Sequence, residues 1–200
     1  ILYSSARYQY AIKRLMRVLE RTVDTLQYQL KQGSFQPSQF ELSFSLMEDL
    51  EGIQIPLSKE EKIVLRGRID RVDTYVKDDS LFVKVIDYKS GNKDFDLASL
   101  YYGLQLQLIV YMNAALQLGK KKYPNLKPVP AGILYYKVDD PLVEMKGQAL
   151  SEEQRNAELY KQLKMSGIVN ENPEIVHLLD GSFSDASDVI PVKRNKDGSY

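Results

Sequence analysis

Three charged side chains stand where they could act together on one substrate: Asp70, Asp87 and Lys89. Alternate residues of a strand share a face, so Asp87 and Lys89 would point the same way at the end of the apolar segment 81–89. Turn residues at 78–80 predict a hairpin that brings position 70 of the preceding strand close to position 87. Two converging carboxylates do not both ionise readily unless a cation lies between them. Hard cations such as Mg2+, Mn2+ or Ca2+ suit such a pair, and Mg2+ also accepts the phosphate oxygens of a substrate.

Lys89 could serve this pair in two ways. It could orient or deprotonate a metal-bound water, or it could offset the charge that develops on a phosphate. The bare pattern Asp/Glu-x-Lys is not distinctive, because it recurs at 60–62 and 144–146. The copy at Asp87 differs because it ends a strongly apolar strand and follows an upstream Gly-x-Ile-Asp. A surface ion pair between Asp87 and Lys89, with Asp70 paired to a neighbouring arginine, fits the spacing equally well.

Gln107 and Tyr111 lie four residues apart and would share one face of a helix. Gln107 interrupts an apolar sequence, where a long amide needs a hydrogen-bond partner. The pair could lie over the carboxylates or a nucleic-acid backbone. Without further information, a boundary glutamine beside a core tyrosine is the commoner arrangement.

The pattern along the chain predicts the elements that must hold these residues. A helix is expected over 5–32, with an apolar stripe formed by Ile12, Met16, Leu19, Val23, Leu26 and Leu30. Lys13, Arg17 and Arg21 occupy another face of that helix, which is either a phosphate-facing stripe or an ordinary solvated face.

Alternation and turn residues predict strands over 40–47, 63–76, 81–89 and 131–138 and helices over 96–118 and 151–165. We expect α/β architecture, a small mixed sheet flanked by helices, in which the strand after helix 96–118 pairs parallel to the hairpin. The expected organisation is a single domain over 1–200, with a helix at 5–32, an α/β core at 40–145, a helix at 151–165 and an irregular tail at 167–200. The basic run 120–122 is expected to be a solvated turn or a DNA contact.

Composition restricts the chemistry further. The 200 residues carry 27 Lys and Arg against 27 Asp and Glu, so the net charge is zero and offers no general attraction to nucleic acid or an anionic membrane. Cysteine is absent, which excludes disulfides, thiolate zinc sites and iron–sulfur ligation within these residues. The single histidine, His177, excludes multi-histidine metal sites. The chain shows neither a signal-peptide leader nor a long apolar run, and it begins without Met, so we expect a cytoplasmic fragment with no membrane partner.

The segments 67–70 (GRID), 85–91 (VIDYKSG) and 107–111 (QLIVY) together resemble the RecB-type branch of the PD-(D/E)xK nucleases. That branch joins an Asp, an Asp-x-Lys and a following helix with Gln-x-x-x-Tyr. Two further segments, 35–41 (FQPSQFE) and 131–141 (AGILYYKVDDP), resemble the C-terminal nuclease domain of the AddB component of bacterial AddAB-type helicase–nucleases. The resemblance runs through most of residues 33–195 and implies a restriction-endonuclease-like core.

The resemblance also implies a role for each matching residue. The catalytic set would be Asp70, Asp87, Lys89, Gln107 and Tyr111. Asp70 and Asp87 would bind the metal together with the Tyr88 carbonyl, Lys89 would be the catalytic lysine, and the last two would be an accessory pair. The implied cofactor is Mg2+, with Mn2+ as a substitute.

The implied function is that of a Mg2+-dependent DNA exonuclease in double-strand break repair and recombination, with DNA and an AddA-type helicase–nuclease subunit as partners. Two features of that family are missing from this sequence. RecB-type sites usually have a histidine far upstream of the first Asp, whereas His177 lies downstream and is expected to be a surface residue. The family's iron–sulfur cluster has no cysteine ligand here. We therefore expect the fragment alone to be weakly active or inactive, and the alternative is a catalytically incomplete, nuclease-like scaffold that binds DNA or the partner subunit.

Overall fold

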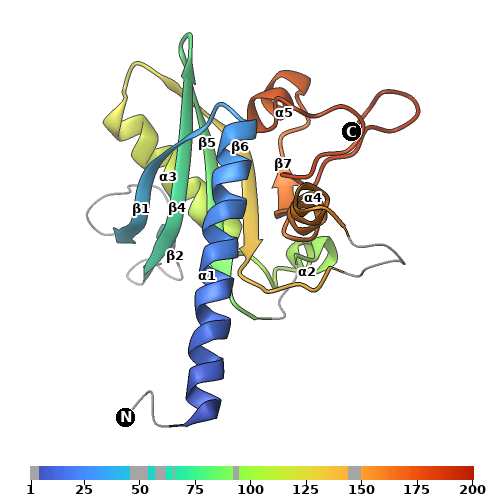
Figure 1. Ribbon diagram of the computed structural model, residues 1–200. Coiled ribbons are helices and arrows are strands. Elements are labelled where there is room, and N and C mark those ends of the chain that lie inside the picture. Colours follow the sequence, from blue (N-terminus) through green and yellow to red (C-terminus); the bar gives the residue numbers. More distant parts are fainter. Residues whose placement is uncertain (1–4, 46–53, 57–61, 65, 92–94, 144–149) are drawn as a thin grey trace.

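A mixed sheet of five strands forms the centre of the molecule (Figure 1). The computed structural model describes residues 5–45, 54–56, 62–64, 66–91, 95–143 and 150–200. In spatial order the strands are β1 (Gln36–Ser45), β4 (Arg66–Lys77), β5 (Ser80–Lys89), β6 (Lys127–Lys137) and β7 (Ser166–Val169). Within this sheet β5 and β6 pair parallel, and the other neighbours pair antiparallel. A small second sheet pairs β2 (Gln54–Pro56) with β3 (Lys62–Val64). The predicted α/β fold with a small mixed sheet is confirmed.

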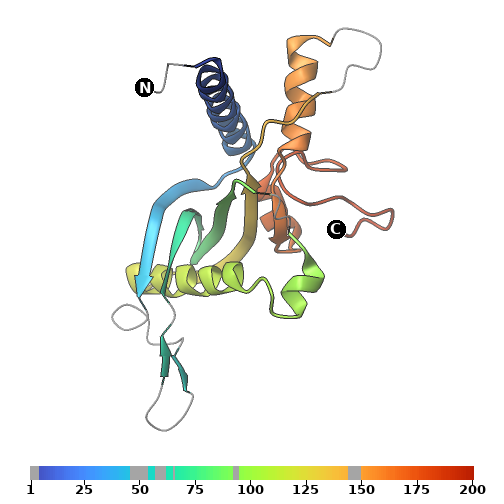
Figure 2. The ribbon, with the colours of Figure 1, turned by 90° about the horizontal axis from the view of Figure 1, so that it is seen from below.

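Helices cover both faces of the five-stranded sheet (Figure 2). On one face lies α3 (Gln107–Lys122), and on the other lie α5 (Pro173–Leu179) and the last turns of α1 (Ala6–Gln32). The core is therefore divided into two clusters, one on each side of β5. Burial on both faces explains why the sequence of β5 is an almost continuous apolar run rather than a strict alternation.

The segment between β5 and β6 forms two helices where the sequence predicted one over 96–118. The first is the short α2 (Leu97–Tyr101), whose N-cap Asp96 accepts hydrogen bonds from the main-chain N–H groups of the first turn. Gly103 then adopts a φ of 77°, a left-handed conformation that ends a helix and favours glycine. Gln107 is therefore the first residue of α3 and not a residue in the middle of one long helix.

The apolar stripe predicted on α1 is not a core face over most of its length. Met16, Leu19 and Val23 are each more than half exposed, and the fully buried side chains of this helix are Thr25 and Gln29. Figure 1 shows why: α1 runs past the edge of the sheet, so that only its last turns pack on the core. The stripe has the helical period, but the described part of the chain offers it little surface to pack against.

The expectation of an irregular tail at 167–200 fails for its first part and holds from residue 180 on, where the chain has only turns, bends and an isolated bridge. After α4 (Glu152–Gln162), whose cap Ser151 makes a capping box with Gln154, the chain forms β7 and then α5. Asn172 caps α5 and Pro173 opens it. Elements of four and seven residues are too short to produce a clear period, which is why the sequence pattern missed them. His177 lies on the exposed side of α5, as expected for a surface residue.

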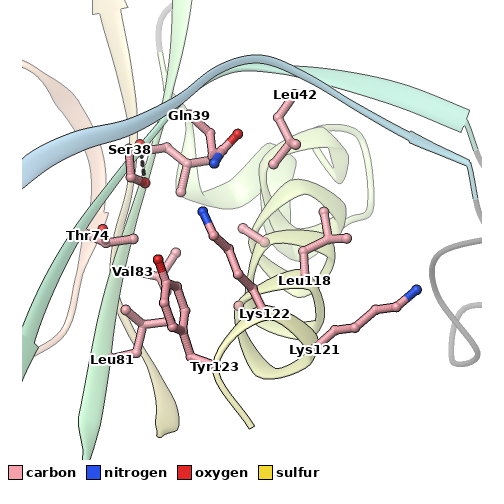
Figure 3. Close-up of a pocket in the computed structure, with 13 residues that line it drawn as sticks. Ser38, Gln39, Leu42, Thr74, Leu81, Val83, Leu118, Lys121, Lys122 and Tyr123 are labelled. Atoms are coloured by element: carbon pink, nitrogen blue, oxygen red, sulfur yellow. Dashed lines mark hydrogen bonds between the residues drawn. The ribbon is translucent and has the colours of Figure 1, made fainter.

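A hollow of about 330 Å3 lies between the C-terminal half of α3 and the sheet (Figure 3). Its floor includes Leu81 and Val83, from the half of β5 remote from Asp87. Lys122 points into it and Lys121 points away. The basic run 120–122 is the last turn of α3, where positive charge complements the helix dipole, rather than a loop.

Two arginines of α1 hold a carboxylate that follows β6. Arg17 donates from Nε and Nη2 to Asp140 Oδ2 at 2.8 and 2.5 Å, and Arg21 donates to Asp140 Oδ1. The hydrogen bond from Arg17, with Arg21 adding its charge, holds the pKa of Asp140 below its usual value. Arg17 and Arg21 are thus partly solvated, as one alternative expected, but both are paired with Asp140.

We predict that Asp140→Asn loosens α1 and lowers the free energy of unfolding by about 1–2 kcal/mol at pH 7, since it removes a charged acceptor shared by two partly exposed arginines. Because the pKa of Asp140 is lowered in the folded state, this stabilisation is complete above the ordinary carboxyl pKa of 3.8 and is lost as the pH falls through the lower folded value. Urea unfolding at several pH values and hydrogen exchange over α1 measure the effect. Equal stability of the variant and the wild type at pH 7 would contradict it.

Candidate active site

Asp70, Asp87 and Lys89 converge at one end of the sheet. The pairing of β4 with β5 runs to Arg71 opposite Ile86, so the next residues of the two strands are Asp70 and Asp87. Lys89 Nζ lies 2.5 Å from Asp87 Oδ2, and Asp70 Oδ2 accepts a hydrogen bond of 2.8 Å from the main-chain N–H of Tyr88. The hairpin thus brings together the three side chains that the sequence singled out.

Burial controls the charge of this group. The side chain of Asp87 is 4% exposed, and burial raises the pKa of its carboxyl, with Asp70 adding to the shift and Lys89 opposing it. Burial alone would lower the pKa of Lys89, but its ion pair with Asp87 outweighs this and leaves the pKa raised. Lys89 is therefore a cation here, and its charge stabilises the ionised form of the buried Asp87.

Gln107 connects Lys89 to the helix above the sheet. Lys89 Nζ donates to Gln107 Oε1 at 3.3 Å, and Gln107 Nε2 donates to the Tyr111 hydroxyl at 2.7 Å. Tyr111 is buried, with its ring edge-on to Phe44 at a centroid separation of 5.8 Å. Both sequence alternatives hold in part, because Tyr111 is a core residue and Gln107 also lies over the charged group.

Two contributors were not identified from the sequence. The ring of Tyr135 lies under Lys89, with Nζ 5.1 Å from its centroid. Gly67 passes so close to the aromatic pair that a Cβ there would lie 2.5 Å from Phe44 Cζ and 3.2 Å from Tyr111 Cε1. Tyr135 could have been found from the expected parallel pairing of β5 with β6 once its register was known, because that register pairs Tyr135 with Asp87. The signal for Gly67 was its place in the Gly-x-Ile-Asp string.

The arginines near Asp70 have other partners. Arg68 Nε lies 2.7 Å from the Glu41 carboxylate. Arg71 donates from Nε and Nη2 to Asp73 at 2.6 and 2.7 Å, and Lys84 Nζ lies 3.0 Å from the same carboxylate. Arg68 and Arg71 thus pair with Glu41 and Asp73 rather than with Asp70, whereas the other part of that alternative, an ion pair between Asp87 and Lys89, is present.

Comparison with known proteins places the chain in a family. A model of the PD-(D/E)XK nuclease superfamily matches residues 2–184. The chain belongs to the PD-(D/E)XK nuclease superfamily. It is similar to the B subunits of proteins named ATP-dependent helicase/deoxyribonuclease: 46% identical to that of Lachnoclostridium phytofermentans and 43% to that of Clostridium tetani, in each case over 100% of this chain and 17% of the relative. The chain thus spans about a sixth of the length of these curated relatives.

The donors at this PD-(D/E)XK site suit a hard divalent cation. Asp70 and Asp87 offer carboxylate oxygens. A third donor is the Tyr88 carbonyl: in an antiparallel pair the N–H and C=O of one residue point to the same neighbouring strand, and the Tyr88 N–H donates to Asp70, so its carbonyl is directed to that side. Among the residues that the structure describes, no group of three or more His, Cys, Asp or Glu side chains could hold a metal ion. Asp87 is buried beside a second carboxylate, Asp70, so a further positive charge at this point would stabilise both. Mg2+ can bind through only one or two carboxylates. The residues therefore fit the divalent metals that PD-(D/E)XK nucleases generally use.

A search of the described helices for a membrane-spanning segment found none that is long and apolar enough.

We predict that replacing each of two buried aspartates of this nuclease domain by asparagine changes the stability of the fold to very different extents. Asp73→Asn leaves the buried Arg71 and Lys84 without their counter-ion and should lower the free energy of unfolding by about 3–5 kcal/mol. Asp87→Asn removes a buried charge that faces Asp70, and Lys89 is exposed enough to be solvated, so stability without metal should change by less than about 1 kcal/mol. Urea unfolding in a chelator measures both. A large loss for Asp87→Asn would mean that this ion pair holds the fold together.

Proposed function

We propose that this domain is a DNA exonuclease that hydrolyses phosphodiester bonds with Mg2+, Mn2+ being a substitute, at a site formed by Asp70, Asp87 and Lys89. The observation that carries the proposal is the convergence of two carboxylates, one of them buried, with a lysine at the end of a central strand. Membership of a nuclease superfamily and relatives named as deoxyribonucleases support it.

In the proposed mechanism Asp70, Asp87 and the Tyr88 carbonyl hold the metal ion. When bound, the ion acts as a Lewis acid toward the phosphate and lowers the pKa of a water ligand. Lys89 places a positive charge beside this position. We propose that this charge offsets the negative charge that develops on the phosphate, which is the second of the two roles considered for Lys89.

Gln107 and Tyr111 act through Lys89 in this proposal. Three contacts fix the ammonium group: the Asp87 carboxylate, the Gln107 amide oxygen and the Tyr135 ring. Gln107 is itself oriented by the buried Tyr111 hydroxyl. They are positioning residues, because their hydrogen bonds set where Nζ lies and the substrate need not touch them.

We further propose that the domain works in the cytoplasm in double-strand break repair and recombination, beside an AddA-type helicase–nuclease subunit. The support is the name of the relatives, which describes one subunit of a combined helicase and deoxyribonuclease.

The test is Mg2+-dependent cleavage of single-stranded DNA by the domain within its natural flanking sequence. Asp87→Asn and Lys89→Gln should each lower kcat by at least about 100-fold, because the first removes the charge of a proposed metal ligand and the second removes the cation beside the reacting phosphate. Asp79→Asn, in the exposed turn between β4 and β5, is the matched control and should leave the rate unchanged. Metal-dependent cleavage no greater in the wild type than in Asp87→Asn would instead favour the non-catalytic scaffold.

Replacing the positioning amide should have a smaller effect. Gln107→Leu frees Lys89 Nζ on one side, and we expect kcat to fall about 10- to 100-fold with KM nearly constant. Gln107→Glu keeps an acceptor for Lys89 and should retain more activity than Gln107→Leu. Gln117→Leu on the same helix controls for helix effects. A change in KM alone would show that Gln107 contacts the substrate directly.

A further inference from the structure

The segment 95–107 is attached at both ends to the surroundings of Lys89. At its start, the Phe95 ring lies 6.4 Å from the Tyr135 ring, which is the ring under Lys89. At its end, Gln107 accepts the hydrogen bond from Lys89 Nζ. Whatever the middle of the segment presents to solvent is therefore held beside the proposed active site, where α2 adjoins the start of α3 (Figure 2).

The middle of the segment presents large apolar side chains, not a packed helix. No residue of α2 is buried. Tyr101 and Tyr102 are 84% and 76% exposed, and their rings meet edge to face at 5.4 Å. Beside them, Leu97, Leu104 and Leu106 are also more than half exposed.

Polar contacts, not apolar packing, hold the segment in this shape. Asp96 accepts hydrogen bonds from Ala98 and Ser99, and its own N–H donates to Gln105 Oε1, which closes the segment on itself. The left-handed Gly103 turns the chain between α2 and α3. With the segment closed by these hydrogen bonds, the side chains of Tyr101 and Tyr102 lie on its outer surface, exposed to water.

The chemistry of the segment indicates what it contacts. Between 95 and 107 the one charged residue is Asp96, and its carboxylate is engaged as a helix cap. Such a surface cannot grip phosphates, but exposed aromatic rings stack on nucleobases of any sequence. Bases in a duplex are already stacked and paired, so the rings can reach them only in a single strand.

We propose that Tyr101 and Tyr102 form a stacking platform for the unpaired bases next to the phosphate that is cleaved. This inference rests on the proposed nuclease function and deepens it, because it names the residues that would hold the bases of a single-stranded substrate. In this proposal the phosphate is bound and hydrolysed at the charged group of Asp70, Asp87 and Lys89, and the neighbouring bases stack on the two tyrosines.

The test compares two substrates in the domain with its natural flanking sequence. One is a single-stranded oligonucleotide, and the other is thymidine 5′-p-nitrophenyl phosphate, a small phosphodiester without neighbouring bases. The double variant Tyr101→Ala/Tyr102→Ala should raise KM for the oligonucleotide about 10- to 100-fold and leave hydrolysis of the small ester unchanged. Tyr101→Phe/Tyr102→Phe keeps both rings and should retain wild-type values. Tyr8→Ala/Tyr10→Ala, which removes two exposed tyrosines from α1, is the matched control.

A second readout is independent of catalysis. In an Asp87→Asn background, the fluorescence of 2-aminopurine in the oligonucleotide should be quenched on binding when the tyrosines or phenylalanines are present and not when alanines replace them. Failure of the wild type to hydrolyse the small ester defeats the proposed function, while the fluorescence still decides whether the platform exists. Unchanged KM and quenching in the alanine variant overturn the platform alone. A variant that binds DNA normally but no longer assembles with a helicase subunit also overturns it, because the tyrosines would then be a protein interface.

Discussion

The ion pair between Asp87 and Lys89 is the interaction on which the site depends. Asp87 is almost without solvent, which raises the pKa of its carboxyl, and the ammonium group 2.5 Å away opposes that shift. The surroundings of the pair arise because β5 is the middle strand of the sheet and its neighbours each bring one group to the same end. Asp70 comes from β4, Tyr135 comes from β6, and Gln107 comes from α3.

The two ionic groups along this hairpin differ in their balance of charge. Asp73 lies among two cations, Arg71 and Lys84, and every one of these side chains is buried, so the group is closed to further ligands. Asp70 and Asp87 share one cation, Lys89, which leaves an excess of negative charge. A buried charge is stable only beside an opposite charge. The group around Asp73 meets this requirement within the protein and so stabilises the fold, whereas the group around Asp87 would be stabilised by an added divalent cation.

The sequence predicted the hairpin and its carboxylates because local rules determine both: a turn, a period of two and residues two apart. It did not predict what depends on distant packing. The exposed stripe of α1 has a correct helical period, but a period does not say whether a partner surface exists. The cation–π contact of Lys89 with Tyr135 joins residues that are remote in sequence, and only the parallel register of β5 and β6 brings them together. The break at Gly103 was visible as a glycine, yet the apolar residues on both sides favoured a single helix.

A net charge of zero is consistent with this division of labour between charge and stacking. A nuclease that captured DNA from solution would benefit from a basic surface that steers it over a distance longer than a Debye length, about 10 Å at 0.1 M salt. This chain has 27 basic and 27 acidic residues, and several of its cations are engaged with carboxylates inside the protein. A site of this kind acts at short range, on a strand that is already delivered to it. Delivery of one separated strand is what a helicase motor provides, and the relatives of this domain carry the word helicase in their name. If the two proposals above hold, the zero net charge and the exposed aromatic rings of α2 have one physical explanation, which is a substrate that arrives single-stranded and already guided.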